Sequence, residues 1–128
     1  MARKSEKLEQ KPNLKESGHS FGDYFKRAVN PMLVLRLLSE KPMYVYQMTQ
    51  ELKQRGDSEC TVSFLYPVLY RLQKLGYVEE SGKQISEDNR VRNYYAITQM
   101  GQEHLEALSK EYQQLVLSVE KIMKGYHD

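Results

Sequence analysis

Residues 63–78, SFLYPVLYRLQKLGYV, carry two tyrosines and two cations at spacings that fit one side of a helix. At about 100° per residue, five apolar residues form one stripe: Leu65, Val68, Leu69, Leu72 and Leu75. The opposite side holds Tyr66, Tyr70, Arg71 and Lys74. Hydroxyl, guanidinium and ammonium groups donate hydrogen bonds to anionic oxygens, and aromatic rings pack on flat apolar surfaces. A helix face that contacts only solvent rarely carries two aromatic rings, which indicates a binding surface. Alternatively, both tyrosines could pack beneath a neighbouring hairpin or against the preceding helix.

The rest of the sequence offers little catalytic or metal-binding chemistry. His19, His104 and His127 are widely separated, and none has a cysteine, histidine or carboxylate at a spacing that suits zinc. No glycine-rich phosphate loop is present. The single cysteine, Cys60, cannot form an internal disulfide, which fits a reducing compartment and a small buried side chain. We therefore expect no enzymatic activity, no cofactor, no metal and a cytoplasmic location.

Length and charge predict one domain that follows a polar tail. The chain has 128 residues and a formal net charge of +2. Residues 1–20 contain five Lys or Arg and three Asp or Glu, so the excess charge lies there and the remaining residues are neutral overall. A lysine-rich segment of this kind buries too little apolar surface to offset the entropy of ordering, and we expect it to be flexible. No run of eighteen apolar residues occurs, so we expect no membrane partner.

Hydrophobic spacing predicts three helices in the first part of the domain. The first starts at Phe21, and Asn30 followed by Pro31 either caps a new helix or kinks a continuous one. The second lies within about residues 44–55 and ends at Gly56. The third is the tyrosine-bearing helix described above, with Thr61 or Ser63 as its N-cap and Gly76 at its end.

Two β-prone segments and a long helix follow. Residues 77–81 and 91–98 are rich in Tyr, Val and Ile and predict a hairpin whose loop, residues 82–90, faces solvent. The hairpin carries Lys83, Arg90 and Arg92. Thr98 is expected to cap a helix that continues to about Tyr126.

The order of three helices and a hairpin is that of a winged helix-turn-helix. In this arrangement the third helix enters the major groove of DNA, and the hairpin touches the backbone or the adjacent minor groove. Tyrosine hydroxyls, Arg71 and Lys74 would then donate to phosphate oxygens. The sequence therefore predicts binding to double-stranded DNA.

The last helix carries a narrow apolar seam with alternating spacings of three and four residues. The seam residues are Leu105, Leu108, Tyr112, Leu115, Val119, Ile122 and Tyr126. Such a heptad pattern favours packing against an identical helix, and the chain contains no second one. We expect a homodimer, although the helix could instead fold back on the first helix of its own subunit.

Three segments of the sequence resemble the PadR family of transcriptional regulators. These are PMYVYQM (42–48), LYPVLYRLQKLGYV (65–78) and RNYYAIT (92–98), the last with Gly101 three residues on. The resemblance covers about residues 25–126, and the single C-terminal helix is similar to the smaller subgroup of the family. It implies a dimeric winged-helix repressor whose C-terminal helices meet, with a ligand pocket at the dimer interface in some members.

The resemblance also implies roles for particular residues. Tyr46 and Tyr66 fall on family tyrosines that contact DNA, and Arg90 and Arg92 fall on the basic residues of the wing. Where many members have Gly-Thr before Leu-Tyr, this chain has Ser63 and Phe64, which changes the turn that meets DNA. The glycine that members have between the two tyrosine-region positions is Val45 here, so that helix start can differ in shape.

The resemblance points to a small aromatic effector as well. Drug-binding relatives stack flat ligands on an aromatic residue, often tryptophan, and this chain has none. Phe25 and Tyr112 could line such a space, although seam packing also explains Tyr112.

The sequence thus predicts a mainly α fold with a small β-hairpin, a winged helix-turn-helix followed by a long C-terminal dimerisation helix. We divide it into a flexible tail (1–20), a DNA-binding domain (21–98) and a dimerisation helix (99–128). The alternatives are a winged-helix module that binds protein, and a ligand-binding dimer without direct operator recognition. The predicted DNA contacts are Tyr46, Ser63, Phe64, Tyr66, Tyr70, Arg71, Lys74, Lys83, Arg90 and Arg92.

Overall fold

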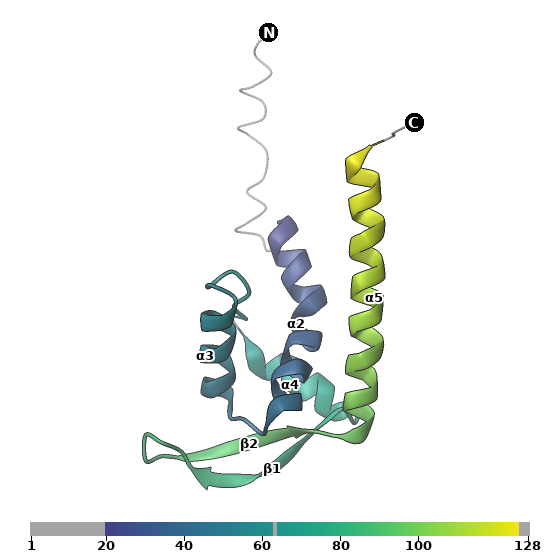
Figure 1. The fold of residues 1–128 in the computed structure, drawn as a ribbon. Coiled ribbons are helices and arrows are strands. Elements are labelled where there is room, and N and C mark those ends of the chain that lie inside the picture. The colour runs from purple at the N-terminus through teal and green to yellow at the C-terminus, as the bar shows by residue number, and fades with distance from the viewer. Residues whose placement is uncertain (1–19, 63, 126–128) are drawn as a thin grey trace.

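The computed structural model describes residues 20–62 and 64–125 and contains helices and one hairpin in the predicted order (Figure 1). Most of the predicted tail lies outside the described residues, as do Ser63 and Tyr126. The elements are α2 (Phe21–Glu40), α3 (Val45–Arg55), α4 (Leu65–Lys74), β1 (Val78–Ile85), β2 (Val91–Ile97) and α5 (Gln99–Lys124).

Helix α2 is continuous through Pro31, which decides between the two arrangements that the sequence left open. Ser20 caps it, because its side-chain oxygen accepts a hydrogen bond from the Asp23 amide at 3.1 Å. The second half of α2 supplies four buried core residues, Val34, Leu35, Leu37 and Leu38. Helix α2 is therefore one continuous helix, and one side of its second half contributes to the core.

One hydrophobic cluster joins α2, α3, α4 and the strands. Its other buried members are Met43, Met48, Leu52, Val62, Leu65, Leu69, Leu72, Val78 and Tyr95. Met43 also pairs with Tyr95 of β2 in an isolated antiparallel bridge, with N–O distances of 3.1 and 2.9 Å. The connection between α2 and α3 is thereby fixed to the hairpin.

The start of α4 differs from the prediction. Its N-cap is Phe64, with no side-chain cap hydrogen bond, so the predicted capping by Thr61 is wrong, and Ser63 lies outside the described residues. Helix α4 ends at Lys74, and Gly76, with φ of +85°, forms the turn that closes it as predicted. Leu75 was predicted to complete the apolar stripe, but it is 51 % exposed because the helix stops one residue before it.

The hairpin is longer and its turn shorter than predicted. Strand β1 runs to Ile85, which pairs with Val91, so that only residues 86–90 form the turn. The register shifts between Glu80 and Gly82, and Gly82 has φ of +116°. Gly82 thus accommodates a bulge inside the strand and does not end it.

Helix α5 starts against the end of α4. The Thr98 hydroxyl accepts from the Gly101 amide at 3.0 Å and donates to the Gly76 carbonyl at 2.7 Å. Gly101 lies so close to the backbone of Tyr77 that a Cβ atom would come within 2.1 Å of its carbonyl oxygen. From this fixed base α5 extends well beyond the body of the domain (Figure 1).

Candidate nucleic-acid interface

The outward side of α4 presents two exposed tyrosines and two exposed cations. The side chains of Tyr66 and Tyr70 are 63 % and 64 % exposed, and Arg71 and Lys74 are exposed as well. Lys74 Nζ lies 5.7 Å from the centroid of the Tyr70 ring, so this cation and ring share one surface. The rings are not packed beneath the hairpin or against α3, which was the alternative reading of the sequence.

The buried side of α4 fixes the direction in which this surface points. Leu65, Leu69 and Leu72 are at most 4 % exposed and belong to the core. Rotating the helix about its axis would expose these leucines, at a cost of about 1.5–3 kcal/mol each. Tyr66 and Tyr70 also line a shallow groove of about 380 Å³ between α4 and the strands. The tyrosine surface and the hairpin therefore lie next to each other.

The basic residues of the hairpin lie in different environments. Lys83 and Arg90 are exposed. The side chain of Arg92 is only 24 % exposed, and its guanidinium lies 4.9 Å from the Tyr44 ring and 6.0 Å from the Tyr46 ring. The structure thus brings together two predicted DNA contacts, Tyr46 on α3 and Arg92 on β2, that are distant in the sequence.

A carboxylate that the sequence analysis did not single out holds the hairpin turn. Arg92 Nη2 donates to Asp88 Oδ2 at 2.5 Å, and the hydroxyl of buried Ser86 donates to Asp88 Oδ1. The hydrogen bond from Ser86, and then that from Arg92, lowers the pKa of Asp88 to about 2. A spacing of four residues signals an ion pair on a helix, but on a hairpin the contact depends on turn geometry that spacing does not give.

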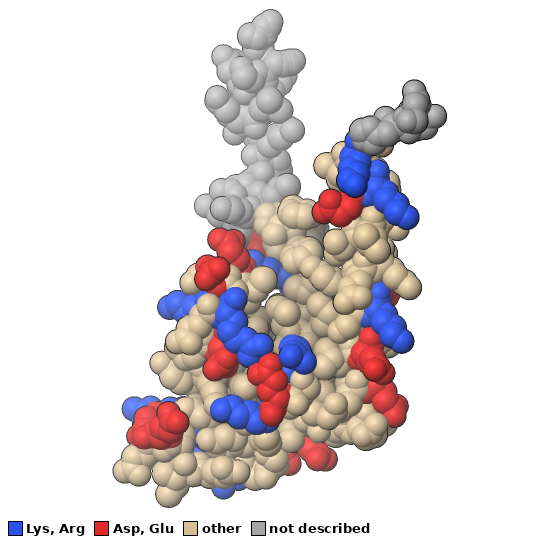
Figure 2. Space-filling model, in the orientation of Figure 1, with Lys and Arg blue, Asp and Glu red and all other residues tan. Residues whose placement is uncertain are grey.

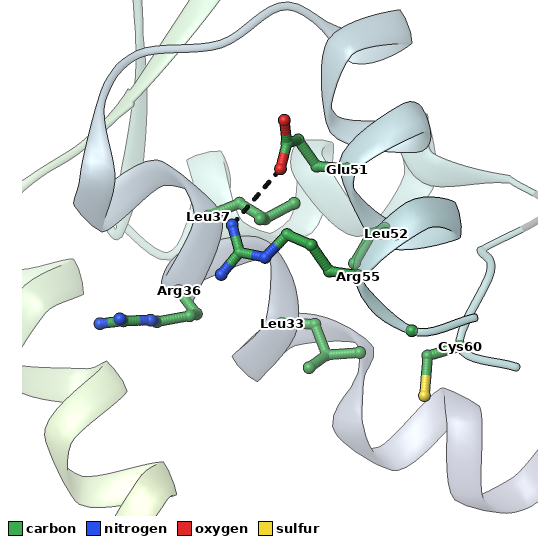
Figure 3. Close-up of a pocket in the computed structure, with 8 residues that line it drawn as sticks. Leu33, Arg36, Leu37, Glu51, Leu52, Arg55 and Cys60 are labelled. Atoms are coloured by element: carbon green, nitrogen blue, oxygen red, sulfur yellow. Dashed lines mark hydrogen bonds and ion pairs between the residues drawn. The ribbon is translucent and has the colours of Figure 1, made fainter. Parts of the chain in front are cut away.

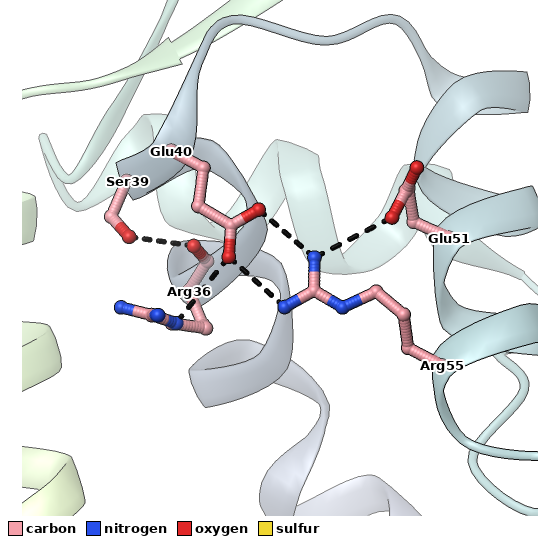
Figure 4. Close-up of polar contacts among 5 residues, drawn as sticks. All are labelled: Arg36, Ser39, Glu40, Glu51 and Arg55. Carbon is pink, nitrogen blue, oxygen red and sulfur yellow. Dashed lines mark hydrogen bonds and ion pairs between the residues drawn. The ribbon is translucent and has the colours of Figure 1, made fainter.

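Helix α3, which carries Tyr46, is tied to α2 by ion pairs (Figure 4). Arg55 donates to both Glu40 oxygens, at 2.9 and 3.0 Å, and to Glu51 at 3.4 Å. Arg36 Nε lies 3.5 Å from the same Glu40 carboxylate. The hydrogen bond from Arg55 lowers the pKa of Glu40. Because these pairs are solvent-exposed, their main effect is on the orientation of α3 and less on stability.

An apolar recess of about 290 Å³ lies beside this network (Figure 3). Leu33 and Leu37 of α2 and Leu52 of α3 line it together with Cys60. Cys60 is a free, half-buried thiol, so the predicted burial is only partial. The recess lies between α2 and α3 and includes none of the predicted DNA contacts.

The residues of the predicted dimer seam change their environment along α5. Leu105 and Leu108 are half-buried and pack against the core. The seam is exposed from there on, at Tyr112, Leu115, Val119 and Ile122. Packing of α5 on its own α2, the alternative that the sequence left open, is thus limited to its lower part.

Phe25 and Tyr112, the predicted effector-pocket residues, lie in different surroundings. Tyr112 lines a recess of about 250 Å³ with Met32 and Leu33, and Phe25 is not part of that lining. Phe25 lies on the exposed side of α2, with its ring centroid 6.3 Å from that of Phe21.

Residues 18–22 read GHSFG, which fits the Gly-x-Ser-x-Gly pattern of serine hydrolases. The sequence analysis passed over this match. Ser20 is the N-cap of α2 and accepts a hydrogen bond from the Asp23 amide, so helix capping accounts for a serine at this position.

The part of the chain that the structure describes contains neither a metal site nor a membrane span. No group of three or more His, Cys, Asp or Glu side chains in residues 20–62 and 64–125 is arranged to hold a metal ion. Among the described helices, none combines the length and the apolar character that crossing a membrane requires.

Charges of both signs are interspersed over the face shown in Figure 2. The chain beyond the tail is also neutral overall. This face therefore presents no field of one sign.

Known proteins share this arrangement. Residues 34–107 match the Transcriptional regulator PadR-like family. A protein of Lysinibacillus sphaericus, described as "Uncharacterized protein X", is 32 % identical over 95 residues, which cover 73 % of this chain and 86 % of that protein.

Solved structures of regulators have the same fold, which confirms the predicted winged helix-turn-helix. The PadR-like transcriptional regulator from Bacillus cereus gives a TM-score of 0.67 at 26 % identity, over 78 % of this chain and 96 % of that chain. A PadR family transcriptional regulator from Eggerthella lenta gives 0.69 at 25 % identity, over 80 % and 88 %. The resemblance found in the sequence is thus confirmed, and the chain belongs to the PadR-like family of transcriptional regulators.

Proposed function

We propose that this DNA-binding regulator is a homodimeric repressor that reads a near-palindromic operator in the cytoplasm. The observation that carries the proposal is the exposed tyrosine and cation surface of α4, held in place by the buried leucines on its other side. In a winged helix-turn-helix, this is the surface that faces the major groove. Tyr66 and Tyr70 would pack on sugars and thymine methyl groups, and Arg71 and Lys74 would pair with phosphates.

The hairpin and α3 would add contacts to the DNA backbone. Lys83 and Arg90 are exposed on the hairpin, and Tyr46 is exposed on the first turn of α3. Arg92 lies beside Tyr46, so both can approach one stretch of phosphates. Phe64 is exposed at the start of α4, where it can pack on a sugar or a base edge. Ser63 stays in the proposal from the sequence alone.

Two copies would be joined through the upper part of α5, where the apolar side chains are exposed to solvent. Leu115, Val119 and Ile122 present one apolar stripe there. A two-fold axis through this contact gives two reading helices, which require half-sites about one helical turn, ~34 Å, apart. An operator of that kind is a near-palindrome, which is the reason for the symmetry in the proposal.

A small aromatic molecule is proposed as the effector that releases the DNA. The two rings proposed to line its pocket, Phe25 and Tyr112, are both partly exposed in the single subunit. The two-fold contact would have to bring Phe25 or Tyr112 of one copy towards the other copy. A flat ligand stacked there would bias the spacing of the two reading helices.

An electrophoretic mobility shift with fragments of the promoters that neighbour the protein's own gene tests the proposal. Each pairing of a cation with a phosphate releases counterions, so affinity should fall steeply between about 50 and about 200 mM salt. A shifted complex whose affinity is indifferent to salt would contradict phosphate contacts by Arg71, Lys74 and Arg90. Unlabelled fragments of unrelated sequence supply the matched competitor.

One observation favours a second candidate function, the binding of a protein partner. Phe64 is 78 % exposed next to exposed Tyr66, and aromatic side chains of this kind are frequent at protein interfaces. Lys74→Gln separates the two functions, because it should weaken DNA binding and leave an aromatic contact nearly unchanged. An unchanged DNA affinity in that variant would favour the protein-binding function.

A further inference from the structure

The turn of the hairpin is organised around one carboxylate. Asp88 receives the Ser86 hydroxyl on Oδ1 and the Arg92 guanidinium on Oδ2, and Arg90 Nε lies 3.9 Å from the same Oδ2. The backbone closes the turn with Ser86 N donating to the Arg90 carbonyl at 2.8 Å and Asn89 N donating to the Ser86 carbonyl at 2.9 Å. Two arginines proposed to contact DNA thus share one negative partner in the free protein.

Arg92 is held at the junction between the hairpin and α3. Its guanidinium faces the rings of Tyr44 and Tyr46, and the Tyr44 ring in turn packs on the Tyr94 ring, with centroids 5.3 Å apart. Arg92 Nε is buried and finds no acceptor among the described residues. The aromatic rings restrict the guanidinium, and Asp88 occupies its Nη2 donor.

A carboxylate and a phosphate offer a guanidinium the same chemistry. Both present anionic oxygens at hydrogen-bonding distance, and both bind arginine through its planar donors. A DNA phosphate that approaches the start of α3 would therefore meet Arg92 already paired. Binding this phosphate requires Asp88 either to yield its place or to remain close to a second negative group, and both outcomes cost affinity.

We propose that Asp88 is an internal competitor of the DNA phosphate for Arg92, and that this pairing sets how tightly the hairpin holds the DNA backbone. The inference rests on the proposed DNA-binding surface. Asp88 is a positioning residue, because it acts on DNA only through Arg92. Buried Ser86 keeps the carboxylate in place, so the competitor is built into the turn and is not a chance surface contact.

The test compares two variants that change the charge of the same turn by the same amount. Asp88→Asn removes the competing charge and keeps an oxygen that can accept from Ser86. Glu87→Gln removes the neighbouring exposed carboxylate, for which the structure gives no pairing with Arg92. Fluorescence anisotropy with an operator fragment at low salt should show Asp88→Asn binding about three- to tenfold tighter than Glu87→Gln.

The same comparison in an Arg92→Met background decides the mechanism. Once Arg92 is absent, most of the difference in DNA affinity between Asp88→Asn and Glu87→Gln should disappear, because only the longer contact of Asp88 with Arg90 remains. If Asp88→Asn binds no tighter than Glu87→Gln in the presence of Arg92, the proposal is overturned, since a purely structural role of Asp88 predicts weaker binding. Thermal unfolding checks the fold, and Asp88→Ser, which also suits a turn, replaces Asp88→Asn if that variant does not fold.

The experiment separates this inference from the proposed function. Wild-type protein that binds no operator fragment overturns both. Wild-type protein that binds in a salt-dependent way, with equal affinities for the Asp88→Asn and Glu87→Gln variants, overturns only the role of Asp88.

Discussion

Apolar side chains are buried at one end of the molecule and exposed at the other, the upper end of α5 (Figure 1). Where α3, α4 and the strands meet the lower half of α2, Leu35, Met43, Met48 and Leu69 are almost completely buried. At the upper end of α5, Ile122 is 76 % exposed, and several of its apolar neighbours are similarly bare.

The difference separates two tasks. The lower part has its own buried core, which holds the side chains proposed to contact DNA in one orientation. The upper part presents an apolar surface that is exposed to solvent in the single subunit. Large exposed apolar surfaces commonly form interfaces. Four changes test this division: three of them alter side chains of one part only, and Gly101→Ala acts where the two parts join.

The largest effect is expected from Leu115→Asp in the upper part. The change places an unpaired charge in the proposed contact between the two α5 helices, at a cost of about 3–5 kcal/mol to association. Sedimentation velocity should show monomers at concentrations at which the wild type is dimeric. The core contains no part of this surface, so circular dichroism should show an intact fold.

Gln114→Asp is the matched control for this change. Gln114 is the preceding residue on α5, is exposed, and lies well off the seam at about 100° per residue. The Gln114→Asp substitution introduces the same charge and should leave the dimer intact. An unchanged dimer in Leu115→Asp would instead show that the seam is not the contact.

The next largest effect is expected from the double variant Arg71→Glu with Lys74→Glu on α4. Both side chains are exposed, so the fold and the dimer should persist, while affinity for an operator fragment should fall about 100-fold or more through loss of phosphate contacts and added repulsion. Anisotropy and sedimentation measure the two properties separately. Full DNA affinity in the double variant would remove α4 from the proposed interface.

A smaller effect is expected at the junction of the two parts, from Gly101→Ala. The new Cβ would lie 2.1 Å from the Tyr77 carbonyl oxygen and 2.7 Å from Ile97 Cγ1, so α5 must shift on its base, at about 1–3 kcal/mol. Urea unfolding monitors the loss. Gly22→Ala on α2 is the comparison, because nothing lies within 4 Å of its new Cβ and it should not destabilise the protein.

The smallest effect is expected from Glu40→Gln, which loosens α3 on α2. Arg55 lowers the pKa of Glu40 in the folded protein, so this pair stabilises the fold above the ordinary carboxyl value of 4.5 and loses its effect as pH falls through the lowered value. The wild type should melt at a slightly higher temperature than Glu40→Gln at pH 7, and the difference should vanish once the pH falls below the lowered pKa of Glu40. A difference that persists there would assign the effect to packing.

The same contrast explains how much the sequence could predict. The buried side of α4 was predicted correctly, because its leucines repeat with the helical period and this period determines which side is buried. Leu75 fits that period too, but its exposure depends on where the helix stops, which is set by the turn at Gly76. Hydrophobic periodicity therefore predicts the buried face of a helix well, but it predicts the residue at which the helix ends poorly.

The hairpin shows a second limit. Gly82 suggested a loop, yet the strand continues through it as a bulge, because pairing with β2 stabilises the backbone on both sides. The contact of Asp88 with Arg92, and of Arg92 with Tyr44 and Tyr46, joins a turn, a strand and a helix. No spacing in the sequence reports a contact that exists only after the hairpin has folded onto α3.

The central claim is that the upper part of α5 joins two copies, so that the two α4 helices bind two half-sites. Hydroxyl-radical footprinting of an operator fragment is its most direct test. We expect two protected patches on one face of the duplex, about one helical turn or ~34 Å apart, and the loss of both patches in the Leu115→Asp variant. A single protected patch that persists in that variant would contradict the claim.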